Sequence, residues 1–205
     1  MNCEDKVYLI ESYSKTLETY GDTAEAVHWT SASQCYRFKV LTEIAVLESE
    51  NILDYGCGKG DLYEYLHDSG FRGLYTGFDI NPELIALAEK KFPGIRFEVL
   101  DVEEKAINES FDYVLISGVF NNRISNNWSV MTNVLKATYA CASRGLAFNA
   151  VSTYVNFRQP MMNYVSPEKC FRFCMSHLSP YVTLRHDNLP FNFAVYVYRK
   201  ADWKK

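Results

Sequence analysis

The residues best suited to bind a ligand form one short run, Asp54-Tyr55-Gly56-Cys57-Gly58-Lys59-Gly60-Asp61, which follows the apolar residues Ile52 and Leu53. Three alternate glycines allow positive φ angles, and without a Cβ they let the backbone turn sharply against a bound group. The free amides of a helix that begins here would face the same group. Ligands bind at the carboxyl ends of parallel strands, so the run predicts a ligand-binding turn.

The spacing of the glycines indicates which ligand this turn binds. A dinucleotide fingerprint is G-x-G-x-x-G, but Asp61 stands where the third glycine would fall, and a pyrophosphate would meet its carboxylate. The acid at the head of the run, Asp54, suits a ligand with a positive ammonium group. The pattern therefore disfavours a nicotinamide oxidoreductase.

Two further acids follow the next predicted strands. Asp79 ends the apolar segment 74–79, where a carboxylate can accept hydrogen bonds from both hydroxyls of a ribose. The alternative role of helix cap is already filled by Asn81, which precedes Pro82. Asp101 follows the alternating segment 95–100, and it is placed to accept from an adenine amino group while Val102 packs on the ring.

These residues require strands and helices that alternate. Apolar runs predict strands at 51–55, 74–79, 95–100, 111–117 and 146–151, with helices at 60–69, 82–92 and about 130–144, the last ended by Gly145. Such alternation implies a parallel sheet with right-handed crossovers. After a helix at about 167–178, two strands at 181–185 and 191–199, joined by an Asn188-Leu189-Pro190 turn, can pair antiparallel.

Together the residues resemble the class I S-adenosylmethionine-dependent methyltransferases, over about residues 50–150. The resemblance implies an α/β fold, a Rossmann-like doubly wound seven-stranded sheet with an antiparallel last strand. It implies that Asp54 and the glycines at 56, 58 and 60 hold the methionine part of S-adenosyl-L-methionine, Asp79 the ribose, and Asp101 with Val102 the adenine. Ser117 and Gly118 would line the methyl-donor face, and the same site is expected to include Tyr55, Cys57 and Ile80.

No internal repeat, low-complexity tract or linker interrupts the sequence, which predicts a single domain with an N-terminal helical arm. Residues 1–48 are expected to form an N-terminal helical arm or lid, and residues 49–205 the cofactor-binding domain. The arm segment 29–38 looks like the cofactor-covering helix of small-molecule members, in which Arg37 would clamp the cofactor carboxylate. A surface arginine on an amphipathic helix is the alternative for Arg37.

The acceptor pocket is expected over the ends of the fourth and fifth strands and under a lid at 152–166. Candidate acceptor contacts are Asn121, Asn149, Tyr154, Arg158 and Tyr164. A sulfonium leaving group is already activated, so a general base is optional and none is assigned. The alternatives are cyclisation or elimination on the cofactor itself, or binding without turnover.

The amino-acid composition limits the kinds of partner that this protein is expected to bind. A net charge of -4 gives no footprint for a phosphate backbone, so a small molecule is expected and nucleic acid is not. Residues 151–205 nevertheless hold eight basic and three acidic residues, which indicates either a solvated basic tail or an anionic substrate nearby. Six scattered cysteines predict reduced thiols and no metal site. Without a leader or spanning segment, the sequence predicts a cytoplasmic protein with no membrane partner, and a homodimer is left open.

Overall fold

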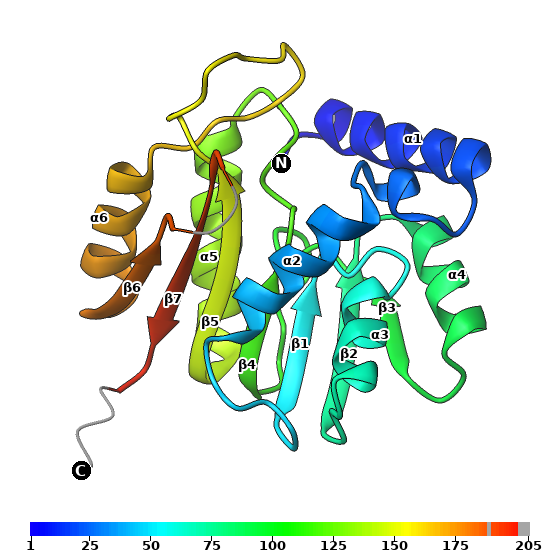
Figure 1. Cartoon of the computed structure of the whole chain (residues 1–205), viewed down its shortest axis with the longest axis horizontal. Helices are drawn as coiled ribbons and strands as arrows, with labels where there is room; N and C mark the ends of the chain where they lie inside the picture. The colour runs from blue at the N-terminus through cyan, green and yellow to red at the C-terminus, as the bar shows by residue number, and fades with distance from the viewer. Residues whose placement is uncertain (188–189, 201–205) are drawn as a thin grey trace.

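The computed structural model describes residues 1–187 and 190–200, and its centre is one seven-stranded sheet of order β3-β2-β1-β4-β5-β7-β6 (Figure 1). The strands are β1 (Asn51–Tyr55), β2 (Leu74–Asp79), β3 (Arg96–Val99), β4 (Phe111–Ile116), β5 (Ala142–Val151), β6 (Tyr181–Arg185) and β7 (Asn192–Tyr198). The helices are α1 (Cys3–Tyr20), the 3-10 helix η1 (Ala24–Val27), α2 (Ser31–Thr42), α3 (Asp61–Asp68), α4 (Pro82–Lys91), α5 (Asn127–Cys141) and α6 (Pro167–His177).

The sheet confirms the predicted topology. Strands β3, β2, β1, β4 and β5 are parallel, whereas β7 pairs antiparallel with both β5 and β6. The carboxyl ends of the five parallel strands therefore meet at one edge, the upper edge in Figure 1, where the glycine turn and the acids that follow β2 and β3 come together.

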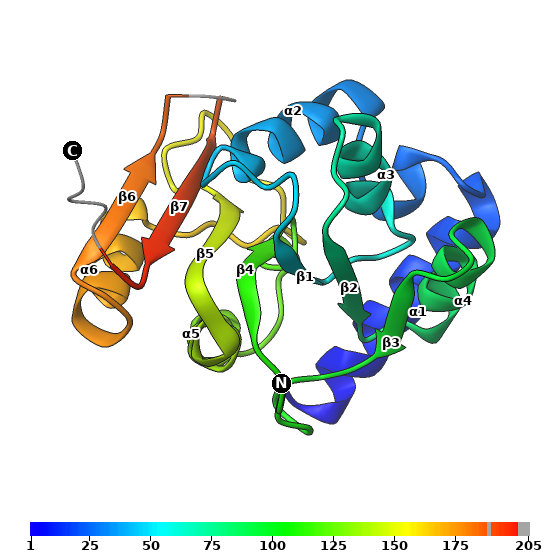
Figure 2. The ribbon, with the colours of Figure 1, turned by 90° about the horizontal axis from the view of Figure 1, so that it is seen from below.

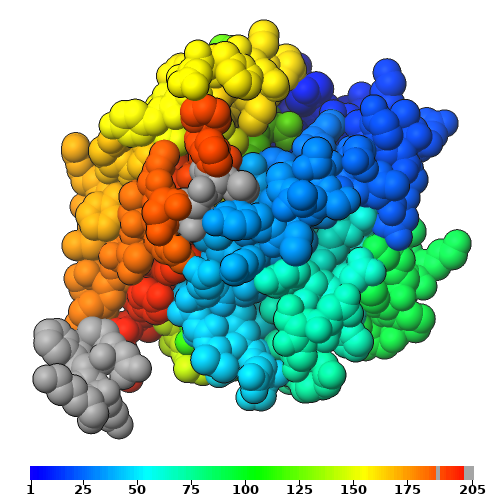
Figure 3. All heavy atoms as spheres, in the orientation of Figure 1, coloured from blue at the N-terminus to red at the C-terminus, as the bar shows by residue number. Residues whose placement is uncertain are grey.

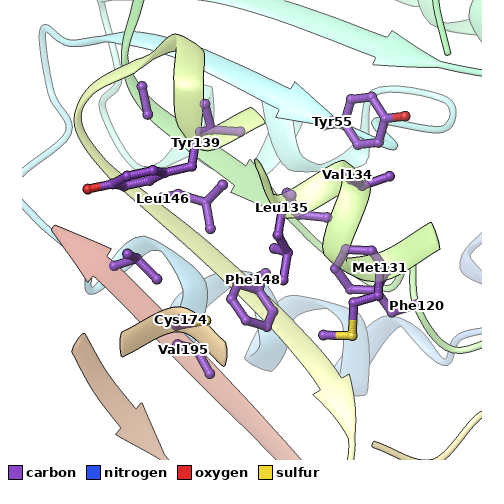
Figure 4. Close-up of a cluster of buried hydrophobic side chains, with 14 of the residues drawn as sticks. Tyr55, Phe120, Met131, Val134, Leu135, Tyr139, Leu146, Phe148, Cys174 and Val195 are labelled. Atoms are coloured by element: carbon purple, nitrogen blue, oxygen red, sulfur yellow. The ribbon is translucent and has the colours of Figure 1, made fainter. Parts of the chain in front are cut away.

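Each face of the sheet is covered by helices, which explains why its strands are apolar on both sides. Along β4, Val114 and Ile116 join a core that includes buried residues of α5 and α6, whereas Tyr113 and Leu115 join a core that includes buried residues of α2, α3 and α4. Figure 2 shows α2 and α3 on one side of the sheet and α5 on the other. Figure 4 shows the first core, in which side chains of α5 meet those of β5 and β7.

One predicted boundary is wrong. Gly145 does not end the fifth helix, because α5 ends at Cys141 and β5 begins at Ala142 with no loop between them. Gly145 lies inside β5, between Tyr113 and Tyr198 on the neighbouring strands. The predicted turn at 188–190 lies partly outside the described residues. The last residues of the basic tail, Lys204 and Lys205, lie wholly outside them.

Of the N-terminal helices, α1 and the 3-10 helix η1 lie at the carboxyl edge of the sheet, whereas α2 packs on one face (Figures 1 and 2). No residue of α1 is fully buried, although Tyr13 is partly so, and polar contacts help to hold the helix in place. Lys6 lies 3.1 Å from a carboxylate oxygen of Asp101, and Asn81 donates to the carbonyl oxygen of Ile10. The described chain contains no helix of the length and apolar character needed to cross a bilayer. Likewise, no three described His, Cys, Asp or Glu side chains cluster as metal ligands.

Candidate functional site

A cavity opens at the carboxyl edge of the sheet, beneath the N-terminal helices. Its empty volume, including space open to solvent, is about 1070 Å³. Eight of the predicted cofactor residues line it: Tyr55, Gly56, Gly58, Asp79, Ile80, Asp101, Ser117 and Gly118. The structure therefore brings together, at one cavity, residues from the ends of β1, β2, β3 and β4.

The glycine turn is shaped by close packing as well as by its backbone angles. Gly56, Gly58 and Gly60 all have positive φ, at 79°, 54° and 85°. A Cβ on Gly56 would lie 2.1 Å from Cγ2 of Val119, so the turn and the loop after β4 can approach only without a side chain there. Gly60 caps α3, and its absent side chain leaves room for the rings of Phe92 and Phe97.

Asp79 holds the glycine turn and faces the cavity. Its carboxylate accepts from the amide nitrogens of Gly58 at 2.8 Å and Asn81 at 2.9 Å. Burial raises the pKa of Asp79, while these hydrogen bonds act in the opposite direction. The side chain of Asn81 accepts from the amides of Glu83 and Leu84, so it caps α4 as predicted and leaves Asp79 available to the cavity.

Asp101 also reaches the cavity, and it is partnered from the arm. One oxygen of its carboxylate accepts from the amide of Glu103 at 2.9 Å, and the other lies near Lys6 of α1. The arm thus covers the expected adenine end of the cavity. Val102 does not line the cavity; it packs against the core on the α5 side.

Asp54 does not lie where it could contact the methionine part of the cofactor directly. Its side chain is 2% exposed and does not line the cavity, and its carboxylate accepts from the hydroxyl of Tyr75 at 2.6 Å. Burial raises the pKa of Asp54 to about 7. Cys57 is likewise buried, packed against Gly77 of β2.

The end of β4 is positioned by β5. The side chain of Asn149 accepts from the amide of Gly118 at 2.9 Å and donates to the hydroxyl of Ser117 at 3.2 Å. The sequence predicts that Asn149 contacts the acceptor, but its amide oxygen and nitrogen both bind the Ser117–Gly118 turn, which lines the expected methyl-donor face.

Beside this turn lies a buried polar group without partners. Asn121 is 7% exposed, and neither its amide nitrogen nor its amide oxygen finds a hydrogen-bond partner within the described residues. A Cβ on Gly118 would lie 3.6 Å from that amide nitrogen and 3.2 Å from the ring of Trp29. Asn121 does not itself line the cavity, whereas the adjoining Phe120 and Asn122 do. Buried amides are normally satisfied, so this position would suit a polar group that donates and accepts hydrogen bonds.

Arg37 is buried rather than exposed on its helix. It is 8% exposed, and its guanidinium carbon lies 3.9 Å from the ring centroid of Trp29, which lines the cavity. It donates to the side-chain oxygen of Asn192 at 2.6 Å, and its Nε has no hydrogen-bond partner among residues 1–187 and 190–200. Burial lowers the pKa of Arg37 to about 10, so it remains a cation at neutral pH.

The remaining predicted acceptor residues lie farther along the lid. Tyr154 donates to Glu168 on α6, and Tyr164 accepts from the amide of Gln159 while Arg158 lies over its ring. None of the three lines the cavity; Asn163 does.

Sequence reasoning missed Tyr13 of α1. It lines the cavity and accepts from the side chain of Asn122, and burial raises its pKa to about 12. In the sequence, Ile10, Tyr13, Leu17 and Tyr20 recur at the spacing of one helix face. Spacing alone could not show that this face covers a cavity.

Comparison with known proteins identifies the family. A family model described as a methyltransferase domain matches residues 47–143. A protein of Mycobacterium tuberculosis, whose name assigns it provisionally to the methyltransferases without a substrate, is 32% identical over 157 residues, or 74% of this chain and 93% of that protein. A malonyl-[acyl-carrier protein] O-methyltransferase of Acetivibrio thermocellus is 30% identical over 57% of this chain and 40% of its own length. The chain belongs to the class I S-adenosylmethionine-dependent methyltransferases.

Solved structures share the fold. The magnesium protoporphyrin IX methyltransferase of Synechocystis with bound S-adenosylhomocysteine superposes with a TM-score of 0.67 at 13% identity, over 96% of this chain and all of that one. The complex of DhpI with S-adenosylhomocysteine gives a TM-score of 0.63 at 15% identity, over 94% and 93% of the two chains. The enzyme is therefore an S-adenosylmethionine-dependent methyltransferase by family and by fold.

Proposed function

We propose that this methyltransferase transfers a methyl group to a small-molecule acceptor, and that the cavity holds both the cofactor and the acceptor. The observation that carries the proposal is the convergence of the glycine turn, Asp79, Asp101 and the Ser117–Gly118 turn on this one cavity. The name of one fold neighbour, a porphyrin methyltransferase, supports a small-molecule acceptor.

The residues present fit the cofactor. Arg37 does not itself line the cavity but lies over Trp29, which does. Its Nε has no partner among the described residues and would suit the cofactor carboxylate, because a buried cation without an anion is costly. Asp79 would accept from the ribose hydroxyls, and Asp101 from the adenine amino group, with Tyr55 and Ile80 beside them. Asp54 would act indirectly, by supporting the glycine turn from beneath through Tyr75.

The cofactor supplies a methyl group on a positively charged sulfur, and the chain supplies position. Asn149 holds Ser117 and Gly118, and through them the surface against which the methyl group would lie. Asn121 does not line the cavity, so the amides that would orient the attacking group of the acceptor there are those of Asn122 and Asn163. Residues 1–48 would act as the lid that excludes water, since alignment and desolvation provide most of the rate enhancement in such a displacement.

The acceptor end of the cavity is neutral. Its polar side chains are amides and hydroxyls, those of Asn122, Asn163, Ser117 and Tyr13, whereas the acids among the lining residues belong to the adenosine end. With the net charge of -4, this arrangement favours a small molecule over nucleic acid.

Calorimetric titration with S-adenosylhomocysteine tests the cofactor site. We expect wild-type protein to bind it and Asp79→Asn to bind at least tenfold more weakly, because each ribose hydrogen bond to a charged group contributes about 1.5–3 kcal/mol. Asp68→Asn, whose side chain is 78% exposed, is the control. Equal affinity in all three proteins would contradict the assignment.

A screen of small-molecule acceptors for S-adenosylhomocysteine release then tests the reaction. Methylthioadenosine as the product would instead indicate elimination or cyclisation on the cofactor. Release of neither product across the panel, by protein that binds the cofactor, would favour binding without turnover.

A further inference from the structure

The loop between β5 and α6 carries two large apolar side chains at its tip. Phe157 is 63% exposed and Met161 is 55% exposed, and they lie four residues apart. Figure 3 shows this segment, coloured yellow, along the upper edge of the molecule, the edge at which the cavity opens. The two side chains place apolar surface on one loop at this edge of the molecule.

Hydrogen bonds hold the tip in this outward position. The amide of Arg123 donates to the carbonyl oxygen of Met161 at 2.9 Å, and its guanidinium to that of Pro160 at 3.3 Å. The amide of Gln159 donates to the hydroxyl of Tyr164 at 2.7 Å. These bonds therefore hold the loop backbone at Gln159, Pro160 and Met161 in the conformation in which Phe157 and Met161 are exposed.

The charge around the tip is positive. From Tyr113 to Pro167 the sequence holds four basic residues and no acid. Two of the four, Arg123 and Arg158, adjoin the tip, and neither forms an ion pair with any residue in the described ranges 1–187 and 190–200.

Two acidic residues contact residues that lie close in sequence to the arginines or to the loop. Both of their carboxylates already accept hydrogen bonds. Asp5 accepts from the amide and hydroxyl of Ser125, and Glu168 accepts from Tyr154 and Ser166. An apolar tip beside two unpaired cations matches a surface of anionic headgroups over acyl chains, because the tip can enter the chains while the arginines stay among the headgroups.

We propose that Phe157, Met161, Arg123 and Arg158 form a surface that docks this enzyme onto anionic lipid. The sequence-based prediction of no membrane partner rested on the lack of a spanning segment, and a loop that inserts only its tip needs none. Asn163, two residues after Met161, lines the cavity, so docking would set the mouth of the cavity against the lipid surface. The proposal does not depend on the identity of the acceptor.

Vesicle sedimentation tests the docking surface. The probes are vesicles of phosphatidylcholine and phosphatidylglycerol in equal parts, and vesicles of phosphatidylcholine alone. We expect wild-type protein to sediment with the first at low salt, to bind the second much more weakly, and to be released by high salt, because salt screens the arginines.

Two double variants separate the contributions. Arg123→Gln with Arg158→Gln is expected to lower the affinity about thirtyfold, since each arginine near such a surface contributes about 1 kcal/mol. Phe157→Ser with Met161→Ser is expected to lower it about tenfold or more through the lost apolar burial. The matched control is Val46→Ser with Leu74→Ser, which removes side chains that are 76% and 71% exposed at the opposite edge of the sheet. Unchanged binding of S-adenosylhomocysteine shows that each variant is folded.

Three results would overturn the proposal. The first is equal binding to the two kinds of vesicle, or to neither. The second is equal loss of binding in the tip variant and in the control variant. The third is a dimer in light scattering that the tip variant alone dissociates, because the tip would then cover a second copy of this chain. A failure of methyl transfer affects none of these measurements.

Discussion

Replacing Asp54 by asparagine should change how the stability of this protein depends on pH. The carboxyl of Asp54 is buried against the hydroxyl of Tyr75, and its pKa is raised from 3.8 to about 7. In the unfolded chain the pKa returns to its ordinary value. Between about pH 4 and pH 7 the unfolded chain therefore loses a proton that the folded chain retains. The free energy of unfolding falls as the pH rises through this window, and the loss is complete above about 7.

The size of this effect follows from the pKa difference. At about 1.4 kcal/mol for each pH unit, the folded protein loses about 4 kcal/mol across the window. In Asp54→Asn the amide oxygen can still accept from Tyr75, and nothing titrates. The stability of the variant relative to wild type should thus rise by about 4 kcal/mol from pH 4 to pH 8.

Urea unfolding of both proteins at a series of pH values measures this difference. Asp68→Asn, at an exposed site, corrects for the general effect of removing one carboxylate. A difference between Asp54→Asn and wild type that stays flat over the whole range would refute the reasoning, because Asp54 would then ionise in the folded protein as it does in water.

Two further substitutions test the cavity walls. Gly56→Ala would place a Cβ against Val119 at a φ of 79°. We therefore expect a loss of about 2 kcal/mol in unfolding free energy, measured in urea, and weaker binding of S-adenosylhomocysteine, measured by calorimetry. Unchanged values in both measurements would show that the turn and the loop after β4 can separate freely. Asn81→Ala removes the cap of α4 and the contact with Ile10 of the arm, and should cost about 1 kcal/mol in urea unfolding. A cost confined to α4 would leave the hydrogen-exchange protection of α1 unchanged, whereas the structure predicts that α1 loses protection too.

Local patterns sufficed for the elements of the sheet. The strand at 51–55, the cap-proline start at Asn81 and Pro82, and the antiparallel pair near the end of the chain are confirmed, because each depends on residues adjacent in sequence. The fifth strand shows the limit of this approach. Gly145 looks like a helix terminator on its own, and only its pairing with Tyr113 and Tyr198 makes it a strand residue.

The sequence by itself determined the fold class and the glycine turn, since periodicity and missing side chains act over a few residues. Only the tertiary structure decided which polar groups are free. Asp54 and Asn149 are engaged by Tyr75 and by the turn at Ser117, whereas Asn121 has no hydrogen-bond partner in the part of the chain that the structure describes. Hydrogen bonds between distant strands depend on how the strands align in space, and residue types in a row carry no record of that alignment.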